Sequence, residues 1–178
     1  MTATRNVVDI FLQPGDWYFG RGETRIRTLL GSCVAITLWH PQHQLGGMCH
    51  YMLPSRSGMR RQAEDGRYAD EAFALLCREI DKTGTRIEDY EVKLFGGGNM
   101  FPGGGRCLRE HVGSKNAVAG QRLLDQRGVN CKVADLGGVG HRTVLFDLWS
   151  GHVWVRRAIH DAPPEQCQRC ALRNACHG

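Results

Sequence analysis

The stretch Leu30-Gly31-Ser32-Cys33-Val34-Ala35 decides the fold together with a second stretch, Cys49-His50-Tyr51-Met52-Leu53-Pro54. Two apolar segments lie between them, separated by the polar break His40-Pro41-Gln42-His43-Gln44. A proline-containing polar break between alternating apolar runs predicts a β-hairpin, here with strands over residues 33–39 and 46–52. A turn centred between Pro41 and Gln42 places Cys33 directly opposite His50, with their Cβ atoms about 5 Å apart. The hairpin therefore predicts a thiol and an imidazole at one site, as a cysteine nucleophile and its base require.

The same pairing separates the two cysteines near His50, because side chains alternate along a strand. Cys33 shares the face of His50, whereas Cys49 lies opposite Val34 on the other face and is predicted to be a small buried hydrophobe. The Gly31-Ser32 pair allows a sharp turn, so the Cys33 N–H is a candidate oxyanion donor. A neighbouring imidazolium would lower the pKa of the Cys33 thiol. These residues are typical of acyl transfer, and a structural thiol beside a core histidine is the alternative.

The rest of the chain predicts a layered α/β or α+β domain in which strands outnumber helices. Apolar residues recur at helical spacing from Tyr68 to Thr83, and Gly84 is the expected stop of that helix. A second helix is expected to begin with Ser114 as its cap and to run to about Gln126. Residues 1–15 are interpreted as a lead-in. Further short strands are expected at 17–19, 24–29, 91–95, 130–135, 143–147 and 152–155.

Length and composition favour one cytoplasmic domain. The chain has 178 residues, of which 42% are hydrophobic, enough to bury a core. It contains no apolar run of about 18 residues, which predicts no membrane insertion, and its start lacks the pattern of a signal peptide. The net charge of +5 comes from scattered basic residues, so no nucleic-acid binding is predicted. Eight cysteines in a reducing compartment indicate catalysis or metal binding rather than disulfides.

The tail over residues 161–178 is interpreted as an appendage to a catalytic domain over residues 1–160. Pro163-Pro164 breaks regular structure, and the sequence that follows is polar. Four soft ligands lie close together there, namely Cys167, Cys170, Cys176 and His177. They predict a candidate tetrahedral Zn²⁺ site, or an iron–sulfur cluster held by the three thiolates and an external ligand. A disordered or redox-active tail without metal is the alternative, and catalysis itself is expected to need no cofactor.

Several short motifs, taken in their order and spacing, resemble the CheD family of chemoreceptor glutamine deamidases over about residues 16–157. Besides the two stretches of the hairpin, they are Tyr68-Ala69-Asp70-Glu71-Ala72, Lys93-Leu94-Phe95-Gly96-Gly97-Gly98-Asn99-Met100, Val112-Gly113-Ser114-Lys115-Asn116, Asp135-Leu136-Gly137-Gly138 and Gly140-His141-Arg142-Thr143-Val144-Leu145-Phe146. The family often has arginine where Lys115 stands, and lysine keeps the charge without the bidentate fork.

The resemblance implies hydrolysis of particular glutamine amides on the cytoplasmic helices of chemoreceptors, which yields glutamate and ammonia. Some members also hydrolyse glutamyl methyl esters, and some bind a CheC-type phosphatase. It also implies a layered αββα sandwich, similar to deamidase toxins. The nucleophilic cysteine and the histidine of the family fall on Cys33 and His50. Its catalytic threonine falls on Thr28, with Arg27 as the alternative position.

The resemblance leaves two other functions open. A Cys–His pair also serves a general amidase or protease, and a non-catalytic adaptor could act only by binding the phosphatase. The glycine clusters Gly96-Gly97-Gly98 and Gly103-Gly104-Gly105 lack the Lys-Ser/Thr of a phosphate loop and are interpreted as pliable turns near the site. A further hypothesis is that the first cluster lets a substrate helix approach closely.

Overall fold

The structure, a computed structural model, describes residues 6–56, 63–100 and 112–158 of the chain. In these residues the helices are α1 (Ala69–Thr83), the short 3₁₀ helix η1 (Ile87–Asp89) and α2 (Val112–Gln126). The strands are β1 (Val8–Leu12), β2 (Trp17–Arg21), β3 (Thr24–Leu30), β4 (Val34–His40), β5 (Leu45–Tyr51), β6 (Glu91–Gly96), β7 (Cys131–Leu136), β8 (Arg142–Asp147) and β9 (His152–Arg157).

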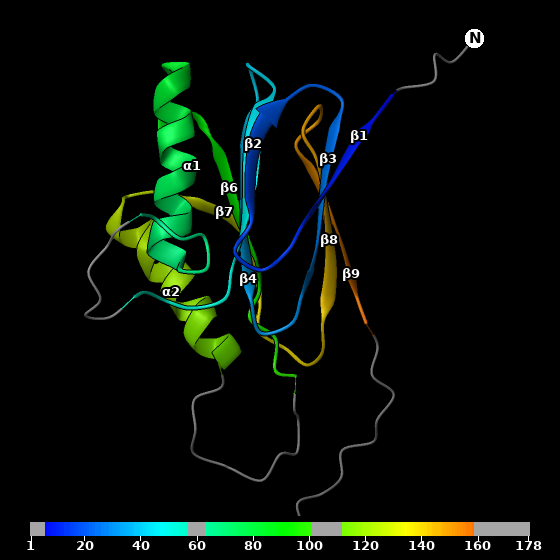
Figure 1. Cartoon of the computed structure of the whole chain (residues 1–178), viewed down its shortest axis with the longest axis vertical. Coiled ribbons are helices and arrows are strands. Elements are labelled where there is room, and N and C mark those ends of the chain that lie inside the picture. Colours follow the sequence, from blue (N-terminus) through cyan, green and yellow to red (C-terminus); the bar gives the residue numbers. More distant parts are fainter. Residues whose placement is uncertain (1–5, 57–62, 101–111, 159–178) are drawn as a thin grey trace, which may run out of the picture.

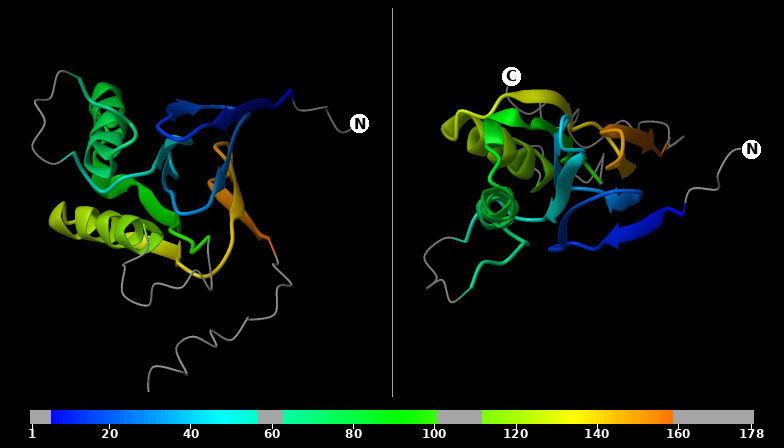
Figure 2. Two further views of the ribbon diagram at one scale, coloured as in Figure 1. Left: turned by 60° about the horizontal axis from the view of Figure 1, so that its bottom comes forward. Right: turned by 90° about the horizontal axis from the view of Figure 1, so that it is seen from above.

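The strands form two sheets that pack face to face. One sheet has the order β1-β3-β8-β9 and the other has the order β2-β5-β4-β6-β7. β1 is parallel to β3 and β6 is parallel to β7, whereas the other neighbours are antiparallel. Figure 1 shows the two sheets edge-on with both helices beyond the five-stranded sheet, and Figure 2 shows the same layers from below and above. The mixed sheets and the two helices confirm the expected α+β class.

Two apolar cores hold these layers together. The first lies between the helices and the five-stranded sheet, and it includes Phe73 of α1, Leu124 of α2 and Cys49 of β5. The second lies between the two sheets, and it includes Ile26 of β3 and Met48 of β5. The expected αββα order is therefore not what the described residues show. They form three layers, α–β–β, because the apolar stripes of both helices pack on the same sheet.

The helices follow their apolar periodicity. The buried residues of α1 recur three or four positions apart, as a helix with one core-facing stripe requires. Gly84 caps its C-terminus with φ of 71°, and its N–H donates to the Asp81 carbonyl, which confirms the expected stop. The second helix begins two residues earlier than expected, at Val112, so Ser114 lies within its first turn rather than at its cap.

The central hairpin forms, but its turn lies one residue further along than expected. Ala35 opposes His50 and Ile36 opposes Cys49, so the turn centre lies between Gln42 and His43. Four residues, 41–44, form the loop, and it closes through the Gln44 N–H, which donates to the His40 carbonyl at 2.9 Å. The strand pairing is thus shifted by two residues, and Cys33 is not directly opposite His50.

The predicted faces survive this shift, because the side chains of a strand alternate with a period of two. Cys33 and Ala35 pack on the core between the sheets, whereas Val34 and Cys49 pack on the core beneath the helices. Cys49 is fully buried there, which confirms its interpretation as a small hydrophobe.

The interpretation of residues 1–15 as a lead-in was wrong, because β1 occupies part of them. Its residues alternate, with Ile10 and Leu12 packed on the core between the sheets and Asp9 and Phe11 on the outer face. No helix in the described residues has the length and hydropathy of a membrane span.

Candidate active site

His50 is held between the two sheets by a chain of hydrogen bonds. The side chain lies on the sheet-facing side of β5 and is only 2% exposed. Its Nδ1 lies 2.8 Å from the hydroxyl of Thr28, a fully buried residue on β3 of the other sheet. The same hydroxyl donates to the carbonyl oxygen of Leu12 on β1, also at 2.8 Å. Three strands from two sheets therefore meet at one imidazole.

This chain of hydrogen bonds determines which ring nitrogen of His50 carries the proton. A carbonyl oxygen only accepts, so the single hydroxyl hydrogen of Thr28 goes to Leu12, and the Thr28 oxygen accepts from Nδ1–H of His50. The Nε2 atom then carries the lone pair. It is buried, and no hydrogen-bond partner for it is found among the described residues. The ring is thus arranged as a neutral base whose free nitrogen is buried.

Of the two positions that the sequence left open for the threonine, only Thr28 contacts His50. Arg27 lies on the outer face of the same sheet, where its Nε is 2.6 Å from Oδ1 of Asp9 and its guanidinium lies over the ring of Phe11. Adjacent residues of a strand point to opposite faces, so Arg27 cannot reach the space between the sheets.

Cys33 lies in the turn between β3 and β4, just before Val34. Its side chain is partly exposed and packs on the core between the sheets, the side on which His50 lies. Because Ala35 opposes His50, Cys33 is the diagonal neighbour of His50 on that face. Diagonal neighbours have their side chains within about 7 Å of one another. The structure therefore places Cys33 diagonally beside His50, which contacts Thr28, on the side of the five-stranded sheet that faces the other sheet.

The first glycine cluster, Gly96-Gly97-Gly98, holds the turn that contains Cys33 through backbone hydrogen bonds. The N–H groups of Gly97 and Gly98 donate to the carbonyls of Cys33 and Gly31, both at 2.8 Å. Gly96 has φ of 121°, and a Cβ on it would lie 2.2 Å from the Cys33 carbonyl oxygen. The space that these glycines leave is filled by the backbone of the protein itself. The cluster lies beside the site as expected, and this packing gives a structural reason for Gly96-Gly97-Gly98. The close approach of a substrate helix stays a prediction.

Burial makes the resting pair neutral. It lowers the pKa of His50 to about 4, against a smaller opposing effect of its hydrogen bonding and of Asp16, and it raises the pKa of the Cys33 thiol. The expected imidazolium that lowers the thiol pKa is therefore not the resting state, because the site is too dry to favour two charges. Thiol and imidazole coexist uncharged, so proton transfer must accompany attack.

The lowered pKa of His50 predicts a pH-dependent stability. Between pH 6.5 and pH 4 the unfolded chain binds a proton at His50 that the folded chain does not, so stability falls as the pH falls through this range. From pH 7 to pH 4.5 the wild type should lose about 2 kcal/mol more unfolding free energy than His50→Gln, which has no such group. Urea unfolding of both proteins at the two pH values measures this difference. Equal losses would contradict the burial of a neutral imidazole.

The remaining predicted site residues lie elsewhere or outside the described residues. Lys115 lies in the first turn of α2 and is exposed. The second glycine cluster, the domain boundary at residue 161 and the four candidate ligands of the tail fall outside the described residues, so the metal site stays a prediction. Within residues 6–56, 63–100 and 112–158 no cluster of His, Cys, Asp and Glu has the arrangement of a metal site.

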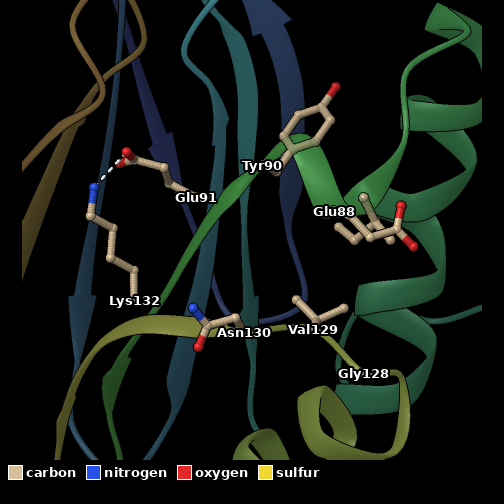
Figure 3. A pocket seen from close by; sticks show the side chains of 8 residues that line it. Glu88, Tyr90, Glu91, Gly128, Val129, Asn130 and Lys132 are labelled. Atoms are coloured by element: carbon tan, nitrogen blue, oxygen red, sulfur yellow. Dashed lines mark hydrogen bonds and ion pairs between the residues drawn. The ribbon is translucent and has the colours of Figure 1, made fainter.

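A pocket of about 350 Å³ lies at the other end of the five-stranded sheet. Figure 3 shows it between the start of β6 and the connection from α2 to β7, with Lys132 paired to Glu91 and with Tyr90 and Asn130 on its walls. Glu91 opposes Trp39 at the far end of β4, whereas Gly96, beside Cys33, opposes Val34. The length of a strand therefore separates this pocket from Cys33 and His50.

Comparison with known proteins gives the family of this chain. A family model described as CheD chemotactic sensory transduction matches residues 52–157. The chain belongs to the CheD family. The family match begins two residues after His50, so the geometry of Cys33 and His50 is an observation independent of it.

Curated CheD relatives extend the likeness over most of the chain. A protein named probable chemoreceptor glutamine deamidase CheD from Pseudomonas savastanoi pv. phaseolicola is 47% identical, over 97% of this chain and all of the relative. A protein of the same name from Pseudomonas fluorescens is 52% identical over 83% of this chain and 84% of its own length. A CheD relative from Leptospira interrogans is 40% identical over 86% of this chain.

One part of this CheD site, the carbonyl of Leu12, was not predicted from the sequence. Every residue has a backbone carbonyl, so no residue type marks it as the acceptor of Thr28. The alternation from Val8 to Leu12 was a usable signal for the strand that carries it.

Proposed function

We propose that this chain hydrolyses glutamine side-chain amides of chemoreceptors, with Cys33 as nucleophile, His50 as base and acid, and Thr28 as the residue that orients His50. The names of its relatives support the reaction and the substrate class. The observation that carries the mechanism is the chain from Leu12 through Thr28 to Nδ1 of His50, because it leaves Nε2 as the basic nitrogen.

In the first half of the reaction, the Cys33 thiol attacks the amide carbon of the glutamine. Nε2 of His50 takes the thiol proton as the S–C bond forms, since the resting pair is neutral. The Cys33 N–H donates to the oxygen of the tetrahedral intermediate. His50 then returns the proton to the amide nitrogen, the C–N bond breaks, and ammonia leaves behind a γ-glutamyl thioester.

In the second half, water replaces the amine. His50 Nε2 removes a proton from the water as the oxygen attacks the thioester carbon. The S–C bond then breaks, the sulfur recovers the proton from His50, and the product is a glutamate side chain. The sum is one water consumed and one ammonia released, and no cofactor takes part. A glutamyl methyl ester fits the same steps, with methanol leaving in place of ammonia.

Removal of the Thr28 hydroxyl should lower activity through the histidine. In Thr28→Val, Nδ1 loses its acceptor, so the tautomer with the base on Nε2 loses its preference, and kcat should fall about 10²-fold. Thr28→Ser keeps the hydroxyl and should stay within about tenfold of wild type. Steady-state kinetics on a receptor fragment measures both. Equal kcat values for the two variants would remove Thr28 from the mechanism.

The reaction is tested by the mass of the receptor. A purified chemoreceptor cytoplasmic fragment is incubated with the protein, and its intact mass and the released ammonia are followed. Deamidation adds about 1 Da per glutamine because NH₂ is replaced by OH, and each step should release one ammonia. Peptide mapping then locates the new glutamates. Fragments in place of 1 Da steps would establish the protease instead.

Partner and location follow from the same proposal. The substrate is the cytoplasmic part of a chemoreceptor, which places the protein in the cytoplasm. A CheC-type phosphatase is a second candidate partner. If the receptor mass stays unchanged with the protein alone but the phosphatase activity changes on its addition, the non-catalytic adaptor is the correct function.

A further inference from the structure

Asn116 on α2 joins the two segments that carry Cys33 and His50. Its side chain is completely buried. Its Nδ2 donates to the carbonyl of Ser32 at 3.0 Å and to the carbonyl of Met52 at 2.8 Å. Ser32 directly precedes Cys33, and Met52 follows His50 by two residues. A single amide group therefore uses both of its hydrogens to hold the nucleophile turn against the end of the strand that carries the base.

The hydrogen bond to Ser32 also fixes the direction of one N–H group. In a trans peptide the C=O and the following N–H point in opposite directions. Because Asn116 holds the Ser32 carbonyl, the Cys33 N–H points away from α2. The neighbouring carbonyls, of Gly31 and Cys33, are held by backbone donors, so the Ser32 carbonyl is the one that depends on a side chain.

The Cys33 N–H itself is available. No hydrogen bond from the Cys33 N–H is found among the described residues, although the carbonyls beside it each accept one. An N–H group that the fold orients but does not use internally suits an oxyanion donor, because its direction needs no reorganisation during the reaction.

We infer that Asn116 is a positioning residue, which aims the Cys33 N–H at the oxygen of the tetrahedral intermediate by holding the Ser32 carbonyl. This inference rests on the proposed function. Asn116 does not touch the substrate, and its effect passes through the peptide group between Ser32 and Cys33. Its loss should lower kcat and leave the chemistry of the thiol itself unchanged.

The same region provides a matched control. The Tyr51 hydroxyl donates to the backbone carbonyl of Asn116 at 2.7 Å, and Tyr51 is also fully buried. Tyr51→Phe removes a buried hydrogen bond between α2 and β5 without disturbing the Asn116 amide. Its loss should lower the stability of the packing between α2 and β5 while both carbonyls that the Asn116 side chain holds keep their donor.

Two reactions of Cys33 distinguish a positioning role of Asn116 from a role in folding alone. Deamidation passes through an oxyanion, whereas alkylation of the thiol by iodoacetamide occurs at a saturated carbon and forms none. For Asn116→Ala we expect kcat to fall 10- to 100-fold and KM to change less than threefold. The alkylation rate of Cys33, measured by peptide mass spectrometry, should stay within threefold of wild type. Tyr51→Phe should change neither rate by more than threefold.

Cys49 reports on the fold in the same samples. It is fully buried, and burial raises its pKa to about 12, so it is alkylated only when the protein opens. If Asn116→Ala opens the fold and so exposes Cys49, the same measurements are made on Asn116→Ser. This smaller change keeps one hydrogen-bond donor at the position. Unfolding of both variants would assign Asn116 to the fold and overturn the inference.

Two further results would overturn it: an Asn116→Ala kcat within threefold of wild type, or an equal loss of kcat in Tyr51→Phe. Failure of the proposed function looks different, since Cys33→Ala would then keep its effect on the receptor, or the wild type would produce no 1 Da steps.

Discussion

Cys33→Ala should lose at least about 10³-fold in deamidation rate, because it removes the atom that forms the covalent intermediate. Binding of the receptor should persist, since the substitution removes only a partly exposed sulfur. Intact-mass kinetics on a receptor fragment measures the rate, and co-sedimentation or titration measures the binding. Cys33→Ser should also be nearly inactive, with a deamidation rate within about tenfold of that of Cys33→Ala. A neutral imidazole with a pKa of about 4 is too weak a base to activate a hydroxyl.

Cys49→Ala is the matched control for this experiment. Cys49 is adjacent to His50 in the chain but packs beneath the helices, on the opposite face of β5. The variant should lose stability through a small cavity, about 1 kcal/mol, and should retain its kcat. Full activity in Cys33→Ala, or loss of activity only in Cys49→Ala, would show that Cys33 is not the nucleophile.

His50→Gln should lower kcat by about 10³-fold, since no other described side chain is held to accept the thiol proton. The glutamine amide is of similar length and can donate to Thr28, so the packing between the sheets should be retained. KM for the receptor should change little, because His50 is 98% buried and contributes little surface to docking. Stopped assays with the intact-mass readout give both constants.

His40 offers a second buried histidine for comparison. It lies at the other end of β4, 4% exposed, with its ring against those of His43 and Tyr90. His40→Gln should reduce stability and leave kcat within about threefold. If both histidine variants lost activity equally, the loss would come from destabilisation, and the assignment of His50 as the base would be wrong.

The prediction of the hairpin shows why a partly wrong pairing still located the site. The turn centre was placed one residue too early, since nothing in the polar residues His40-Pro41-Gln42-His43-Gln44 marks which two of them lie at the centre. The resulting shift of two residues kept every side chain on its predicted face. A shift of one residue would have put Cys33 and His50 on opposite faces of the hairpin, with Cys33 on the face of Cys49.

Other parts of the site could not be predicted from local pattern. Thr28 lies on a strand of the other sheet, and its contact with His50 arises only when the two sheets pack. The αββα order was expected from resemblance, but amphipathic periodicity shows only that a helix has an apolar face, not which sheet that face will meet. Asn116 was quoted within a motif, yet its two carbonyl acceptors lie 84 and 64 residues away.

The sequence by itself determined the elements and the faces of their side chains, because the periods of helix and strand act over a few neighbouring residues. It thereby placed Cys33 and His50 on one side of one hairpin. The tertiary structure alone decided what surrounds that pair: the Leu12 carbonyl, the Thr28 hydroxyl and the Asn116 amide come from three other elements. It also decided the charge of the pair, because the pKa of a group depends on how much water the packed layers exclude.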